Sequence, residues 1–263
     1  MKRLTLNMVR VSTGLMMVLS TPCAWALSVT PARTEVRLHA GETAKAVLTV
    51  TNPHEEAYDV EITEKPWYVL PENQKIQVKD WLELPRKTEF RLKPGQSRDV
   101  TITLHCPKDA VGEVMGMVSF AYQGMTPGMV TPMISTAIYI EIEGTQKNLG
   151  EIVALGAGTR NGRFQIGAQI KATGNVRLRP VGKIRVKDDK DQVVSEYTVP
   201  ELQPLFPGQM RDFTARGSDT PPPAGRYTLA ADLLSGTLEL KKETKILVKA
   251  NGEVEMDKEV PKS

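Results

Sequence analysis

Cysteine is nearly absent from this sequence, which has two in 263 residues. Cys23 lies in a segment that we expect to be removed, so Cys106 has no partner for an intramolecular disulfide. A lipid anchor on Cys23 is disfavoured, because Thr21 and Pro22 precede it where a lipidation site needs Leu-like and small residues. We therefore expect Cys106 to be a small buried side chain and the fold to be held by its apolar core.

Long apolar runs are missing as well. Residues 1–26 combine a basic start, an interrupted apolar stretch at 11–19 and an A-x-A sequence ending at Ala26, which are the three parts of a secretory signal peptide. No later stretch approaches the 18 or so residues of a membrane-spanning helix. We expect cleavage after Ala26, a periplasmic location and a mature chain without a membrane span.

The mature chain also lacks net charge. Loss of the signal peptide removes three basic residues and no acids, so 31 Lys and Arg remain against 31 Asp and Glu. This balance gives no electrostatic reason to expect nucleic acid as a partner. No H-E-x-x-H, G-x-S-x-G or P-loop motif occurs, and the three histidines are scattered. We therefore predict a protein that is not an enzyme and that needs no cofactor and no metal.

Apolar residues recur with a period of two along most of the chain. Short β-branched runs separated by Gly, Pro and Asn are typical of an all-β sandwich, and the 18 prolines and 20 glycines argue against long helices. The expected strands include segments 35–38, 46–50, 59–62, 76–78, 89–92, 100–104, 114–122 and 134–142.

One turn sequence occurs twice. Residues 92–101 read LKPGQSRDVT and residues 205–214 read LFPGQMRDFT, with Phe206 in place of Lys93. In each copy Pro-Gly favours a tight turn that leads into a strand. A unit of slightly over 100 residues that occurs twice predicts two tandem immunoglobulin-like β-sandwich domains. We place the first at 27–146 and the second at 148–249, followed by a frayed polar tail at 250–263.

The first predicted domain resembles the N-terminal domain of the periplasmic pilus chaperones, the PapD-like family. The resemblance lies in the order of its segments: an opening P-A-R-T-E-V-R-L strand with Arg33, the L-x-P-G turn at Leu92–Gly95, an apolar strand over Met115–Phe120 and a closing strand over 134–142. It implies a non-catalytic chaperone for pilus assembly, which binds an envelope or pilus-type protein subunit by β-strand addition at the closing strand.

The resemblance also implies which residues contact the partner. Arg33 matches the first of two basic residues that bind the terminal carboxylate of the subunit in this family. The second, a lysine, has no match here, because its place falls near Tyr139 or Glu141. The apolar contacts implied are Met125 and Met129 in the loop before the closing strand, and a row on that strand: Ile134, Ile138, Ile140 and Ile142.

Other interpretations of the same residues remain open. An isoleucine row on one face of a strand is also the usual core pattern, and Arg33 is equally consistent with an ordinary surface residue. Methionine thioethers suit Cu(I), so Met125 and Met129 also allow a copper-binding periplasmic protein. Trp67, Tyr68 and Trp81 fit either a sandwich core or a platform for wall polymer in a structural or adhesive envelope module.

Overall fold

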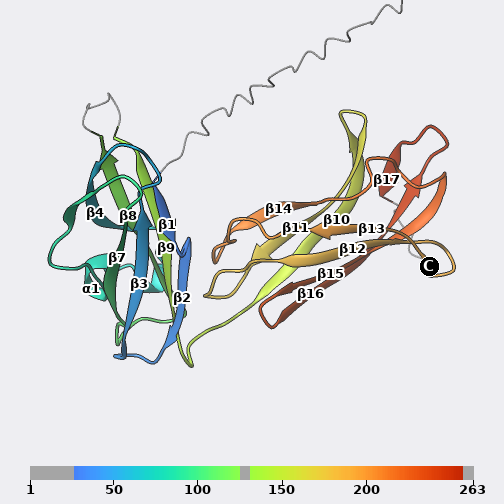
Figure 1. Cartoon of the computed structure of the whole chain (residues 1–263). Helices are drawn as coiled ribbons and strands as arrows, with labels where there is room; N and C mark the ends of the chain where they lie inside the picture. The colour runs from blue at the N-terminus through green and yellow to red at the C-terminus, as the bar shows by residue number, and fades with distance from the viewer. Residues whose placement is uncertain (1–26, 125–130, 257–263) are drawn as a thin grey trace, which may run out of the picture.

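A computed structural model describes residues 27–124 and 131–256 and contains almost only β-strands. The all-β prediction is confirmed, and the strands form two sandwiches (Figure 1). One sheet of the first sandwich has the order β1-β3-β7-β5, and its strands are β1 Ser28–Thr30, β3 Thr43–Thr51, β7 Ser97–His105 and β5 Leu82–Glu83. The facing sheet has the order β2-β9-β8-β4-β6, with β2 Arg33–Leu38, β9 Met133–Ile142, β8 Glu113–Gln123, β4 Tyr58–Pro66 and β6 Glu89–Leu92.

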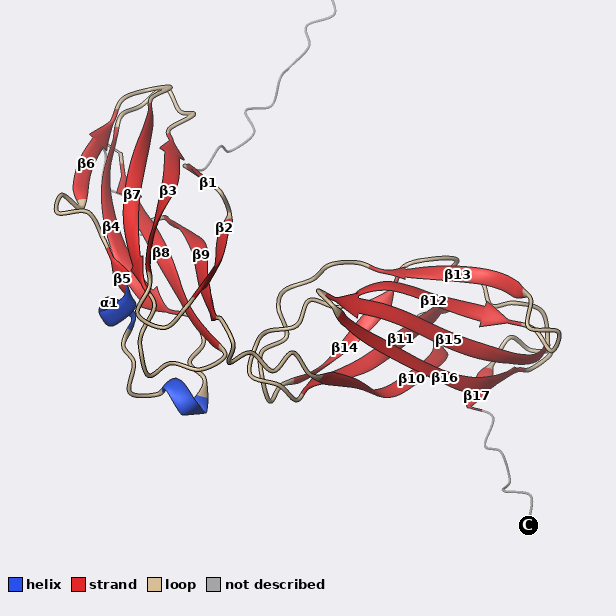
Figure 2. Ribbon diagram, turned by 90° about the horizontal axis from the view of Figure 1, so that it is seen from below, coloured by secondary structure: helices blue, strands red, loops and turns tan. Residues whose placement is uncertain are grey.

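The second sandwich is built from the strands that follow. Its smaller sheet has the order β10-β11-β14, with β10 Gly150–Arg160, β11 Arg163–Ala172 and β14 Met210–Ala215. Its larger sheet has the order β13-β12-β15-β16-β17, with β13 Val193–Val199, β12 Val181–Lys187, β15 Gly225–Ser235, β16 Leu238–Val248 and β17 Val254–Met256. Figure 2 shows that the two sandwiches cross in direction rather than lie in line.

The repeated turn has the same atomic structure in both sandwiches. The side chain of Gln96 accepts a hydrogen bond from the backbone N–H of Lys93 at 2.9 Å, and Gln209 accepts the equivalent bond from Phe206 at 3.2 Å. The central glycine of each turn has a positive φ, 68° and 78°, where a side chain would be strained. The repeat predicted from the sequence is therefore a repeat of turn geometry.

Three local features differ from the sequence-based expectations. The segment 76–78 is not a strand, because Val78–Trp81 forms helix α1 with Gln77 and Asp80 as a capping box. A 3₁₀ turn, η1, precedes it at Pro71–Asn73. The expected polar tail contributes β17, which pairs with β16. Within the described ranges no helix is long and apolar enough to cross a membrane.

The core of the first sandwich takes up much of what the sequence analysis singled out. Trp81 and Cys106 are buried there, 2% and 3% exposed, and burial raises the pKa of the Cys106 thiol. The same core contains Ile138, Ile140 and Ile142, each 0% exposed. The predicted role of these three isoleucines as partner contacts is therefore corrected: their side chains fill the space between the two sheets and cannot reach a partner.

Replacing Ile140 with Ala should lower the free energy of unfolding by about 2–5 kcal/mol, because it leaves a cavity in a closely packed core. Urea unfolding of the purified protein measures the change. Met133→Ala is the matched control on the same strand, since Met133 is 49% exposed. Equal stability losses in the two variants would show that the row is not core.

Candidate functional site

Strand β9 has an open edge along its first residues. On one side β9 pairs with β8 from Met133 to Glu141, and on the other it pairs with β2 only from Ala137 onward. The segment Met133–Thr136 therefore has a neighbouring strand on one side alone. An unpaired strand edge is a template for another strand, which makes this segment the candidate site.

Backbone groups along a strand point alternately to its two sides. The N–H of Ala137 donates away from β8, to the C=O of Ala32 at 3.3 Å. Ser135 and Met133 lie two and four residues before Ala137, so their N–H and C=O groups also face away from β8. Within the described chain no other backbone group bonds to them, so this edge offers two donors and two acceptors.

The side chains of the open edge are partly accessible. Ile134 is half-buried and packs against the core, whereas Met133 is 49% exposed. Ser135 is exposed and shares a hydrogen bond of 2.8 Å with Ser119 on β8. Of the predicted apolar contacts, Ile134 alone remains available within the described residues, and Met125 and Met129 lie outside them.

Arg33 begins β2, beside the point where the open edge ends. Its guanidinium contacts the carboxylate of Glu201, from the second sandwich, at 2.6 Å and that of Glu35 at 3.1 Å. Hydrogen bonding to Arg33 is the main reason why the pKa of Glu201 lies below its ordinary value. Two further arginines, Arg177 and Arg179, approach Glu35 at 3.0 and 3.9 Å. Acids and bases of both sandwiches thus meet along the outer side of β2.

The innermost pair of this network is buried. Glu113 on β8 is 0% exposed at its side chain, and the Arg177 side chain that pairs with it is 6% exposed. The backbone N–H of Arg177 also donates to Glu113 at 3.2 Å. Burial lowers the pKa of Arg177, and the nearby carboxylate of Glu35 opposes that effect. Two buried charges from different sandwiches therefore depend on each other.

Aromatic rings form the second contact between the sandwiches. Phe206, from the repeated turn, stacks on Tyr68 with ring centroids 4.5 Å apart and meets the edge of Trp67 at 5.7 Å. The hydroxyl of Tyr68 donates to the C=O of Pro207 at 2.7 Å. Burial raises the pKa of Tyr139 to about 12, and the Arg177 guanidinium lies 3.7 Å from the centre of its ring. Trp67 and Tyr68 are therefore interface residues here.

The sequence analysis did not single out Arg177 and Arg179, which contact the first sandwich. Both belong to the T-G-N-V-R-L-R-P segment, where two arginines separated by one residue point to the same side of an extended chain. This spacing is the feature of the sequence that indicates a shared contact for the two arginines. The structure places the guanidinium groups of Arg177 and Arg179 3.7 and 5.8 Å from the centre of the Tyr139 ring.

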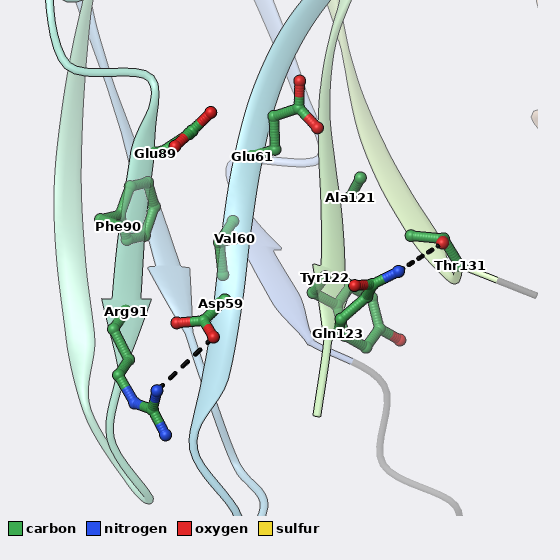
Figure 3. A pocket seen from close by; sticks show the side chains of 10 residues that line it. All are labelled: Asp59, Val60, Glu61, Glu89, Phe90, Arg91, Ala121, Tyr122, Gln123 and Thr131. Atoms are coloured by element: carbon green, nitrogen blue, oxygen red, sulfur yellow. Dashed lines mark hydrogen bonds and ion pairs between the residues drawn. The ribbon is translucent and has the colours of Figure 1, made fainter. Parts of the chain in front are cut away.

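A hollow of 460 Å³ lies on the first sandwich, at β4, β6 and the end of β8 (Figure 3). Arg91 pairs with Asp59 at 3.5 Å, while Glu61 and Glu89 lie directly opposite each other in the sheet. Within residues 27–124 and 131–256, no group of three or more His, Cys, Asp and Glu side chains could hold a metal ion. Charged and polar side chains therefore form a large part of the lining of the hollow.

Comparison with known proteins finds no matching family model and no matching curated protein. Solved structures similar to this chain include the class 5 fimbriae chaperone CfaA, with 16% identity, 83% of this chain and 98% of that chain covered and a TM-score of 0.45. The E. coli chaperone DraB is 13% identical, with 82% and 97% covered and a TM-score of 0.42. The Pseudomonas aeruginosa chaperone CupB2 is 10% identical, with 82% and 98% covered and a TM-score of 0.41.

Replacing Glu113 with Gln should destabilise the protein, by at most about 3–5 kcal/mol, because it removes the buried counter-charge of Arg177 and leaves only the Glu35 carboxylate, 41% exposed, at 3.0 Å. Chemical unfolding followed by circular dichroism measures the loss. The double variant Glu113→Leu with Arg177→Met should recover much of it, since an apolar pair of similar volume avoids the cost of burying charges. If the double variant is less stable than Glu113→Gln, this account of the pair is wrong.

Acidification should weaken the contact between Arg33 and Glu201. The pKa of Glu201 is lower in the folded protein than its ordinary value of 4.5, so its stabilising effect is complete at neutral pH and is lost as the pH falls below that value. The wild type should therefore lose more stability between pH 7 and pH 3 than Glu201→Gln does. Thermal unfolding at several pH values tests this, and parallel pH profiles would contradict it.

Proposed function

We propose that this protein is a periplasmic, non-catalytic chaperone that binds an envelope or pilus-type protein subunit by adding one of its strands to the open edge of β9. The observation that carries the proposal is the unpaired segment Met133–Thr136. Backbone N–H and C=O groups of Met133 and Ser135 face the open side, where an extended segment can continue the sheet.

The side chains around the open edge support the same proposal. Ile134 on β9 and Val29 on β1 are both half-buried and pack against the core of the first sandwich. The two strands belong to opposite sheets, so an apolar side chain of an added strand could pack near both. The partner expected from this chemistry is an extended segment with alternating apolar residues.

Arg33 is a second element of the proposal, because it lies where the open edge ends. Its side chain is 45% exposed and pairs with two carboxylates, that of Glu35 on the same strand and that of Glu201 from the second sandwich. The resemblance to pilus chaperones assigns a carboxylate to this arginine. We propose that Arg33 can exchange Glu201 for the terminal carboxylate of a bound subunit.

Ser135→Pro tests the strand addition, because proline removes an N–H that faces the open edge and is not needed for pairing with β8. The tagged protein is expressed in its own host and captured from the soluble envelope fraction, and the captured proteins are identified by mass spectrometry. We expect the wild type to retain a small β-rich protein in about equal amount, and Ser135→Pro to lose at least nine-tenths of it.

Ser135→Ala is the matched control, because it removes the hydrogen bond to Ser119 and keeps the backbone donor. It should capture the partner as the wild type does, and both variants should unfold at about the wild-type temperature. Normal capture by a folded Ser135→Pro protein would contradict strand addition at this edge. Recovery of the wild type alone, folded and without a partner, would favour an envelope module that binds wall polymer.

A further inference from the structure

Strand β2 covers the rest of the β9 edge. Its six residues pair in parallel with the segment from Ala137 to Ile142, directly after the open segment. If β2 separated from β9, the open edge would extend without a break from Met133 into the segment that β2 now covers. The length of the proposed binding edge therefore depends on how firmly β2 is held.

Few side chains of β2 are buried in the core of the first sandwich. Leu38, at the end of the strand, is its one fully buried residue, and Val36 is half-buried. The hydroxyl oxygen of Thr34 is buried without a hydrogen-bond partner, which costs free energy. Parallel pairing is also slightly less stable per residue than antiparallel pairing. Apolar burial along β2 is thus greatest at its end, at Leu38, whereas Arg33 at its beginning is exposed.

Ion pairs from the second sandwich reach the first residues of β2. Arg33 pairs with Glu201 at 2.6 Å, and Glu35 pairs with Arg177 at 3.0 Å. Arg37, nearer the anchored end, pairs instead with Glu141 on β9 at 3.1 Å. Contacts from the second sandwich therefore lie at the end from which β2 would open.

We propose that β2 is a displaceable strand and that the second sandwich latches it through the pair Arg33–Glu201. Loss of this pair lets the beginning of β2 leave β9 more often and exposes backbone groups that continue the open edge. The consequence for partner capture rests on the proposed function, but the latch itself is a property of the protein alone.

Hydrogen exchange of the purified full chain, resolved by residue with NMR, tests the latch. The N–H of Ala137 faces β2 and bonds to Ala32, whereas the N–H of Ile138 faces β8 and serves as an internal reference. In Glu201→Gln the Ala137 amide should exchange about two- to fivefold faster than in the wild type, the range expected for loss of one exposed ion pair. Arg33→Gln should give at least the same increase.

Glu239→Gln is the matched control, because it breaks the exposed pair Glu239–Lys241, also at 2.6 Å, which does not touch β2. It should leave the exchange of Ala137 unchanged. Unchanged exchange in Glu201→Gln, or an equal rise at Ala137 and Ile138, would overturn the latch. Because no partner is present, this result is independent of the capture experiment, and either proposal can fail alone.

Discussion

The contact between Glu113 and Arg177 is the constraint on which the arrangement of the two sandwiches depends. The Glu113 side chain is fully enclosed at the start of β8, and its counter-charge comes from the loop after β11 in the second sandwich. An unpaired carboxylate at that depth would cost several kcal/mol, so each sandwich supplies what the other needs to fold without an isolated charge. The relative position of the sandwiches is thus part of the folded state.

The aromatic contact also fixes the relative position of the two sandwiches, through apolar packing instead of charge. In both P-G-Q turns the glutamine side chain accepts a hydrogen bond from the backbone N–H of the residue before the proline, yet that residue differs: Lys93 is exposed, and Phe206 is 8% exposed against Tyr68. A single side chain therefore converts a solvent-exposed turn into an interface. Aromatic stacking adds to the burial of apolar surface, so the turn holds the second sandwich against the loop after β4.

The fold was predictable from the sequence because its signals are local. Alternation with a period of two defines strands, and the repeated Pro-Gly turn defines a repeated unit, so neither depends on distant residues. The role of Ile138 and Ile140 was not predictable in the same way. Alternation shows which side chains share one face of β9, but only the packing of the opposite sheet against that face shows that it belongs to the core.

The ion pair between the two sandwiches could not be predicted from the sequence for a related reason. Glu113 and Arg177 are 64 residues apart, and nothing in either local sequence indicates that the two side chains meet. Charged residues are usually exposed, so pattern analysis assigns each of them to the surface. A buried pair between sandwiches becomes visible only when the packing of whole sheets is known.

The short open edge sets a limit on how a strand could be held. Two residues with outward-facing backbone groups offer four hydrogen bonds, each contributing about 0.5–1.5 kcal/mol net. Their sum, about 2–6 kcal/mol, is below the roughly 8 kcal/mol of a micromolar complex even before the cost of ordering the strand. Firm binding at β9 therefore needs either apolar side chains packed near Ile134 or a longer edge. Strand β2 occupies the segment from which a longer edge would come, and its beginning is tied to the second sandwich by Arg33 and Glu201.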